Sequence, residues 1–397
     1  MLSFIEETML SQLERDMAVH KYSQDDLVNM VKSGNLVREL GHCIIHGCSK
    51  TKKACCRAVR ATMHFAGPPC VDWSTQNTRS AEIREFGTHF LVTLCWCAQR
   101  LLVLEPIVLH ENILNFKLAV LVSCLSTAYA IFPGEIDLAE LGWPVHRRRR
   151  LTLLLRLDLL QVVHYPWNKF VNDCRRLTTA TWLDFCAISC HNDIHDFLGW
   201  MRQRPTSMFN MTDRQMRAVI RRECTLWNAN PKPVIKAALE SEFTRALLAS
   251  ECRRLVRYRE MAATSEHGLD YLACLVGQEP GDHAQFSVAP TLNTIIRKTV
   301  ILWANPLGRP FTGLELMSAQ GFVCHHTFSA GGVLSSNFMR ALDRKRAAVS
   351  EQAGNSMPVQ FVGMSIMWAL CATEISEPVS LDPALATLVG LQKKRRT

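Results

Sequence analysis

The sequence has no apolar stretch long enough to cross a membrane as a helix. Residues 89–109 are interrupted by Gln99, Arg100 and Glu105, and residues 117–132 are too few. A spanning helix needs about 20 consecutive apolar residues. We therefore expect a soluble protein with no membrane partner.

A secretory signal peptide and low-complexity or repeated segments are also missing. Residues 1–17 contain four acidic side chains among their apolar ones, which a signal peptide would not. A secretory route is therefore not expected, and the 16 cysteines are interpreted as reduced thiols. The absence of repeats and of biased composition excludes a collagen-like or mainly disordered chain.

The composition is that of a globular protein with a moderate excess of basic residues. Hydrophobic residues make up 48% of the 397 residues, which is enough to fill a sizeable core. The length predicts two or three domains, or one large α/β domain with an insertion. The net charge of +9 is compatible with an acidic partner such as nucleic acid, or with a modest bias that has no partner.

Strand and helix patterns alternate from residue 62 onwards. Residues 62–66, 107–110 and 151–157 have the character of buried strands, and residues 88–104 and 118–128 have that of helices. This alternation predicts an α/β fold with a parallel sheet covered by helices.

The pattern divides the chain into five segments. A mixed N-terminal segment precedes the α/β region, and a looser region that we interpret as a smaller second domain interrupts it. The chain then returns to the α/β pattern and ends in a basic tail, interpreted as solvated, as a phosphate contact or as a nuclear import signal. The segments are residues 1–61, 62–165, 166–289, 290–370 and 371–397.

Two motifs follow the first two predicted strands. Residues 67–70 (Gly-Pro-Pro-Cys) predict a stiff loop, because proline fixes φ and removes a backbone donor, and this loop would hold Cys70 at the carboxyl edge of the sheet. Glu111 and Asn112 follow the next strand, so that a carboxyl group at the same edge would hydrogen-bond or protonate a substrate nitrogen. Alternatives are a packing cysteine and a helix N-terminal acid.

Four consecutive arginines, residues 147–150, precede the third predicted strand. If these residues already belong to the strand, Arg147 and Arg149 lie on one face and Arg148 and Arg150 on the other. One pair would then enter a site while the other meets solvent or phosphate.

The serial order of these motifs resembles that of the cytosine-5 DNA methyltransferases. Gly-Pro-Pro-Cys, Glu-Asn, Gly-x-Pro-x-x-Arg-x-Arg (142–149), Gln-Gly-Phe (320–322) and Gly-Asn-Ser-x-Pro (354–358) follow one another over about residues 62–157 and 290–370. The resemblance implies a Rossmann-like methyltransferase sheet, S-adenosylmethionine as cofactor and duplex DNA as substrate. It also implies that residues 166–289 form a smaller target-recognition domain, and that the protein is nuclear in a eukaryote and cytoplasmic otherwise.

The resemblance implies a role for each matching residue. Cys70 would attack C6 of a flipped cytosine, Glu111 would contact N3, and Arg147 and Arg149 would orient the glutamate and the base or its phosphate. The residues expected to support the catalytic loops are Pro69 and Asn112. Those expected to bind cofactor are Asn355 and Ser356, and those expected to bind substrate are Thr291, Arg297 and Gln320.

The sequence departs from the family upstream of Cys70. The family's Phe-x-Gly-x-Gly cofactor loop is missing, since glycines 34, 41 and 47 are isolated, and Val145 stands where the family usually has glutamine. The N-terminal part of the sheet is therefore expected to be divergent or incomplete. The alternative functions are a catalytically inactive or truncated nucleic-acid-binding relative and, less favoured, an RNA-directed enzyme.

A cysteine-rich stretch precedes the first predicted strand. It contains soft metal ligands, but their spacing fits no regular zinc-binding pair, and we expect no metal. These residues are Cys43, His46, Cys48, Cys55 and Cys56.

Overall fold

The computed structural model describes most of the chain in two compact units. The described ranges are residues 24–33, 61–68, 88–162, 165–177, 180–187, 189, 191–266, 268–281, 286–295, 301–322, 353 and 356–375. The first unit, called the sheet unit, takes its described residues from Met1–Ile136, Arg148–Cys174 and Phe361–Thr397. The second, called the helical unit, takes them from Asp137–Arg147 and Arg175–Gln360.

A four-stranded mixed sheet forms the centre of the sheet unit. Its order is β1 (Met63–Ala66), β2 (Ile107–Asn112), β4 (Arg148–Arg156) and β3 (Tyr129–Asp137). β1 and β2 are parallel, whereas β4 runs antiparallel to β2. The buried apolar run of β4 lies between two neighbours, which is the place that such a run favours.

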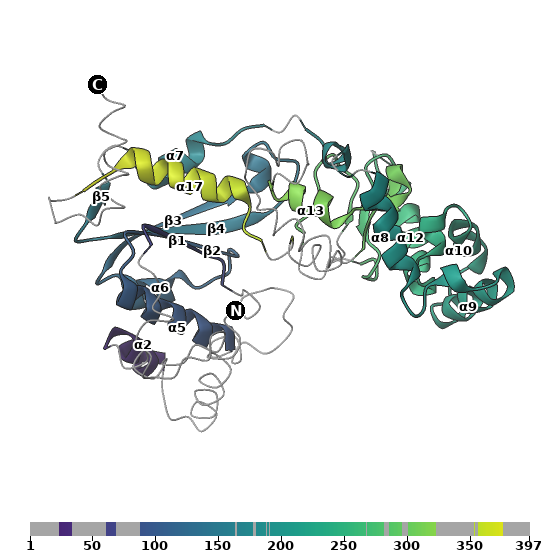
Figure 1. Cartoon of the computed structure of the whole chain (residues 1–397), viewed down its shortest axis with the longest axis horizontal. Helices are drawn as coiled ribbons and strands as arrows, with labels where there is room; N and C mark the ends of the chain where they lie inside the picture. The colour runs from purple at the N-terminus through teal and green to yellow at the C-terminus, as the bar shows by residue number, and fades with distance from the viewer. Residues whose placement is uncertain are drawn as a thin grey trace. The chain divides into compact units, whose positions relative to one another are not determined.

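Helices cover both faces of this sheet (Figure 1). One face packs its apolar residues, including Val108 and Leu154, against three helices, α2 (Gln24–Lys32), α5 (Thr88–Val103) and α6 (Leu118–Leu125). The other face lies under α17 (Val359–Ala372) and α7 (Trp167–Asp173), where Trp368 contacts the rings of Phe132 and Trp167. A small antiparallel sheet of β5 (Leu160–Val162) and β10 (Thr373–Ile375) completes the unit.

The helical unit combines a bundle with a second small sheet. The bundle helices are α8 (His191–Arg202), α9 (Asp213–Leu226), α10 (Pro231–Ala238), α11 (Glu242–Arg245) and α12 (Ala249–Ala262). The antiparallel sheet has the order β7 (Phe286–Ser287), β6 (Ala273–Leu275), β8 (Leu302–Ala304) and β9 (Arg309–Pro310), and α13 (Gly313–Ala319) follows it. Short 3-10 turns are η2 (Leu138–Glu140), η3 (Trp182–Ala187), η4 (Met208–Asn210) and η5 (Asn305–Leu307).

Local sequence signals start the bundle helices. Thr212 and Gln215 form a capping box at the start of α9, and Asn230 caps α10 with Pro231 at its first position. Apolar residues on the inner faces then share one core, which includes Tyr258 and Trp303.

The predicted α/β class is confirmed, and the mixed sheet with helices on both faces is consistent with a Rossmann-like methyltransferase fold. The prediction of a parallel sheet was wrong for β4, which pairs antiparallel with β2.

Three predicted boundaries were wrong. The strand expected over residues 107–110 continues to Asn112, so that Glu111 and Asn112 belong to β2. The helix expected over residues 118–128 ends at Leu125, and the strand expected over 151–157 is β4, which already begins at Arg148. Pairing with β2 explains the last difference, because Arg150 lies opposite Asn112 and extends the ladder beyond the apolar run.

Several expectations concern residues that the structure does not describe or functions that it does not assign. The cysteine-rich stretch 43–56 and the basic tail 393–396 lie outside the described residues. The roles predicted for the five sequence segments stay predictions. None of the helices in the described ranges combines the length and apolar character that a membrane crossing requires.

A buried histidine lies in the middle of β2. His110 is fully buried between the rings of Trp96 and Phe116, with centroid distances of 5.2 Å and 4.7 Å. Neither ring nitrogen has a hydrogen-bond partner among the described residues. Burial lowers the pKa of His110 to about 3, because the charged ring would lose its hydration without gaining a partner.

His110 should therefore make the sheet unit sensitive to acid. Its folded-state pKa lies below the unfolded value, so its contribution to stability is present above about pH 6.5 and is lost as the pH falls towards 3. We expect His110→Phe to remove about 1.4 kcal/mol per pH unit from the pH dependence of the free energy of unfolding below pH 6.5. Urea unfolding between pH 7 and pH 5 measures this slope. His195→Gln, at an exposed position of α8, is the control and should leave the slope unchanged.

Candidate active site

The parallel pairing of β1 and β2 brings two predicted catalytic segments to one edge of the sheet. Ala66 lies opposite His110, so the loop that carries Cys70 starts beside the carboxyl end of β2, where Glu111 is the last residue but one of the strand. Pro68 is the last described residue of that loop, and Pro69 and Cys70 lie outside the described residues. Carboxyl ends of adjacent parallel strands are where α/β proteins place their ligands.

Glu111 is oriented by an arginine from the neighbouring strand. Its side chain is buried, and Arg149 Nε lies 2.9 Å from Glu111 Oε1. Arg149 is itself held by a hydrogen bond of 2.9 Å from Nη1 to the carbonyl of Arg148. A nearly buried ion pair of this kind fixes the direction of the carboxylate, because neither side chain can be solvated in another rotamer.

Asn112 holds the chain directly after β2. Its Oδ1 accepts a hydrogen bond of 2.9 Å from the backbone N–H of Ile113, and its side chain is buried. This contact fixes the turn that follows Glu111.

The arginine run alternates along β4 as a strand requires. Arg149 reaches Glu111, whereas Arg148 and Arg150 both reach Glu135 of β3, at 3.8 Å and 2.7 Å. The predicted alternation is therefore found from Arg148 onwards. Arg147 precedes the strand and belongs to the helical unit.

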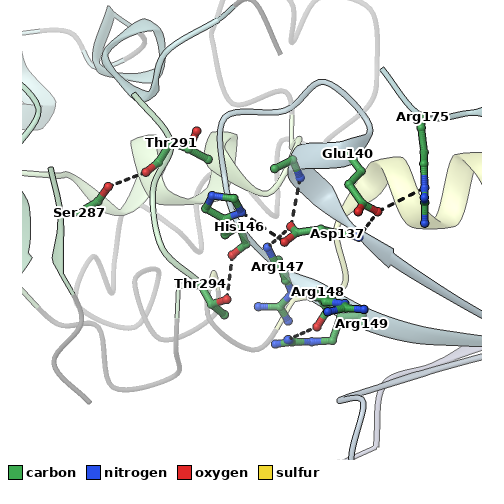
Figure 2. A network of polar contacts seen from close by, with 11 residues as sticks. Asp137, Glu140, His146, Arg147, Arg148, Arg149, Arg175, Ser287, Thr291 and Thr294 are labelled. Atoms are coloured by element: carbon green, nitrogen blue, oxygen red, sulfur yellow. Dashed lines mark hydrogen bonds and ion pairs between the residues drawn. The ribbon is translucent and has the colours of Figure 1, made fainter. Parts of the chain in front are cut away.

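Arg147 forms a buried junction in the helical unit, and Figure 2 shows it beside Asp137 and His146. Its guanidinium donates from Nη1 to the carbonyl of Ile295 at 3.2 Å and from Nη2 to that of Ser356 at 2.9 Å. Its backbone N–H donates to Asp137 Oδ1 at 2.7 Å. Arg147 thus ties together three segments that are far apart in the sequence.

Asp137 organises the loop before β4, and the sequence motifs did not predict this role. Its Oδ1 accepts from the N–H of Ala139, and its Oδ2 lies 3.2 Å from His146 Nδ1. Glu140 returns a contact to the backbone N–H of Asp137, which completes a capping box. The spacing of Asp137 and Glu140 is the sequence signal that identifies such a box.

The same loop is bonded to the segment after β7. The N–H of His146 donates to the carbonyl of Leu292 at 2.7 Å, and the hydroxyl of Thr294 donates to the carbonyl of His146 at 2.7 Å. Val145 is fully buried and forms an isolated bridge with Leu292. The valine therefore occupies a buried apolar position, where the amide of a glutamine would need hydrogen-bond partners.

The remaining predicted ligand residues fall into two groups. Asn355 and Arg297 lie outside the described residues. Thr291 offers its carbonyl to the hydroxyl of Ser287 at 2.6 Å, and the hydroxyl of Ser356 donates to the carbonyl of Ala353 at 2.8 Å.

Gln320 is fully buried at the end of α13. Its carbonyl accepts from the N–H of Val359 at 3.1 Å, and neither atom of its side-chain amide has a hydrogen-bond partner in the described part of the chain. Gly321 follows with a φ of +84°, and a Cβ there would meet the flexible end of the Gln360 side chain. The positive φ favours glycine directly after Gln320.

A buried ion pair between Arg309 and Glu315 precedes Gln320, and the sequence motifs did not predict it. Arg309 donates two hydrogen bonds to Glu315, of 3.0 Å and 2.7 Å, and Thr312 and Glu315 form the capping box of α13. The Thr-x-x-Glu spacing was again the available signal. This pair fixes the start of the helix that ends at Gln320.

Arg147 should be required for the stability of the helical unit. A lysine cannot donate to the carbonyls of Ile295 and Ser356 in the same planar geometry, so one buried carbonyl would lose its partner. We expect Arg147→Lys to lower the free energy of unfolding by about 1–3 kcal/mol, as measured by urea unfolding. Arg148→Lys changes the next, exposed residue and should cost less than about 0.5 kcal/mol. Equal effects of the two substitutions would contradict the junction.

No protein-family model and no curated protein matches the chain. Among solved structures it is similar to the Entamoeba histolytica methyltransferase EhMeth, with a TM-score of 0.40 and 12% identity over 78% of this chain and 76% of that one. It is similar to the S. pombe Dnmt2 methyltransferase, with a TM-score of 0.38 and 13% identity over 77% of each chain. A third similar structure is a putative DNA modification methyltransferase encoded within an E. coli prophage, with a TM-score of 0.40 and 13% identity over 78% and 80%. Because every TM-score lies below 0.5, these likenesses establish neither the family nor the activity of this chain.

Proposed function

We propose that the chain is a cytosine-5 methyltransferase that acts on DNA, with Cys70 as nucleophile and Glu111 as the group that contacts the cytosine ring. The observation that carries this proposal is the parallel pairing of β1 and β2. It starts the Cys70 loop at the sheet edge where Glu111 lies, and Arg149 holds the Glu111 carboxylate at 2.9 Å. The serial order of the sequence motifs supplies the reaction class.

The chemistry follows from these two side chains. The Cys70 thiolate adds to C6 of a cytosine that has been flipped out of the duplex, and the electron pair of the C5–C6 bond moves towards C5. Glu111 binds the ring at N3 and assists protonation there, which makes C6 more electrophilic. Once C5 carries the methyl group, loss of its proton and elimination of Cys70 restore the double bond and release the thiolate.

S-adenosylmethionine would supply the methyl group as an electrophile to the nucleophilic C5. Of the two residues predicted to bind it, Asn355 lies outside the described residues, and Ser356 keeps only the acceptor capacity of its hydroxyl oxygen. A cofactor of this size needs more partners than one hydroxyl.

The missing glycine loop favours one second candidate, a nucleic-acid-binding relative that no longer transfers methyl groups. Such a protein would keep the sheet and the basic loop 147–150 but would not bind S-adenosylmethionine. An RNA-directed enzyme uses the same ring chemistry, so RNA belongs among the tested substrates.

Transfer of labelled methyl groups from S-adenosylmethionine to duplex DNA tests the proposal. We expect Cys70→Ala to abolish incorporation, and Glu111→Gln to lower kcat by about 10²–10⁴-fold, because a positioned acid–base group contributes that much. Glu135→Gln is the matched control, since Glu135 is also a strand carboxylate paired with an arginine but is exposed. It should leave kcat within about twofold.

Two results would overturn this assignment. If Cys70→Ala retains wild-type incorporation, the covalent mechanism is wrong. Incorporation into structured RNA but not into duplex DNA would move the substrate to RNA while keeping the roles of both residues.

Binding of S-adenosylmethionine separates the enzyme from the inactive relative. A ligand at 100 times its Kd stabilises the folded protein by about 2.7 kcal/mol, which raises Tm by several degrees. We expect this shift with S-adenosylmethionine and not with adenosine alone. No shift at millimolar concentrations would favour the inactive relative.

A further inference from the structure

The bundle of the helical unit pairs most of its charges internally. Seven carboxylates there each lie within ion-pair distance of an arginine, and together they occupy seven arginines. The pairs are Asp213–Arg245, Glu223–Arg253, Glu240–Arg259, Glu242–Arg202, Glu251–Arg204, Glu260–Arg257 and Glu279–Arg254.

One flank of α9 carries several arginines outside these pairs. Four of its 14 residues are exposed arginines that form no ion pair with any of the described residues: Arg214, Arg217, Arg221 and Arg222. The two acidic residues of α9 cannot neutralise them, because Asp213 is bonded to Arg245 and Glu223 to Arg253.

Helical geometry places three of these arginines in one row. Positions 214, 217 and 221 lie within about 60° of one another around a helix of 3.6 residues per turn. Met216, Ile220 and Cys224 form the buried stripe of α9, on the side where the helix packs on α12 and α10 (Figure 1). Arg217 lies directly beside this stripe, and Arg221 and Arg214 lie farther from it. The row extends about 10 Å along the axis, which equals about three base-pair steps of 3.4 Å in a nucleic-acid strand.

We propose that this row, which we call the α9 arginine row and define as Arg214, Arg217 and Arg221, binds the phosphate backbone of the nucleic acid. The proposal rests on the proposed function for the class of substrate. The row consists of one charge type without interleaved carboxylates, and a guanidinium binds phosphate oxygens in a bidentate way. The repeating charge of a phosphodiester strand matches such a row, whereas an acidic protein surface presents carboxylates without a regular spacing.

Equilibrium binding to duplex DNA between 50 and 200 mM salt tests the row. The variant Arg217→Gln with Arg221→Gln keeps two good helix formers at exposed positions, so that α9 should remain folded. Each lost phosphate contact makes the negative slope of log K against log salt shallower by about 0.9. The slope of the double variant should therefore be shallower by about 1.8, and the variant should bind DNA about 60-fold more weakly at 0.1 M salt.

A matched variant controls for net charge. Arg175→Gln with Arg257→Gln also removes two exposed arginine charges, but each of these arginines has a carboxylate partner, Glu140 and Glu260. The slope of log K against log salt for this control should stay within about 0.3 of the wild-type slope. A slope that falls equally in both variants, or in neither, would overturn the proposal.

Two further binding experiments identify the kind of polyanion that the α9 arginine row binds. Structured RNA that binds with the same dependence on the α9 arginine row supports the proposal and makes RNA the source of phosphate. Polyglutamate that binds as tightly as DNA, with the same dependence, would overturn it in favour of an acidic protein partner. Binding is measured without transfer, so a wild-type protein that binds through the row but transfers no methyl group would reject only the proposed enzyme.

Discussion

The parallel register between β1 and β2 is the constraint on which the candidate active site depends. With Ala66 opposite His110, the chain leaves both strands at one edge, and a shift of one residue would point Glu111 to the opposite face of the sheet. Packing around β2 holds this register, because a shift of one residue would move His110 out of its place between the rings of Trp96 and Phe116. The chemistry proposed for Cys70 and Glu111 is therefore a consequence of core packing.

The four arginines from 147 to 150 show how one run of like charges is put to different uses. Arg149 orients Glu111, Arg148 and Arg150 share Glu135, and Arg147 binds two backbone carbonyls of the helical unit. Alternation along the strand separates Arg149 from Arg148 and Arg150. Arg147 differs because its backbone N–H donates to Asp137 before the strand begins.

Charge in the helical unit follows a similar logic. Buried and half-buried arginines such as Arg253 and Arg309 are held by carboxylates, since an unpaired guanidinium inside a protein would lose its hydration. The α9 arginine row needs no such partner in the free protein because water solvates it. Charges that are left to solvent in one row are the ones available to a phosphate backbone.

The sequence by itself determined the α/β class, the strand before the Cys70 loop, the apolar run that leads to Glu111, and the alternation of Arg148 to Arg150, because these depend on local patterns of apolar and charged residues. It did not identify Asp137 or the Arg309–Glu315 pair, although the capping boxes of Asp137 with Glu140 and of Thr312 with Glu315 were visible in the sequence. Only the tertiary structure decided that Arg149 binds Glu111, that Arg147 joins Ile295 to Ser356, and that Gln320 is buried. The reason is physical: each of these depends on which distant segment supplies the partner atom, and sequence spacing carries no information about contacts between residues 148 or 209 positions apart.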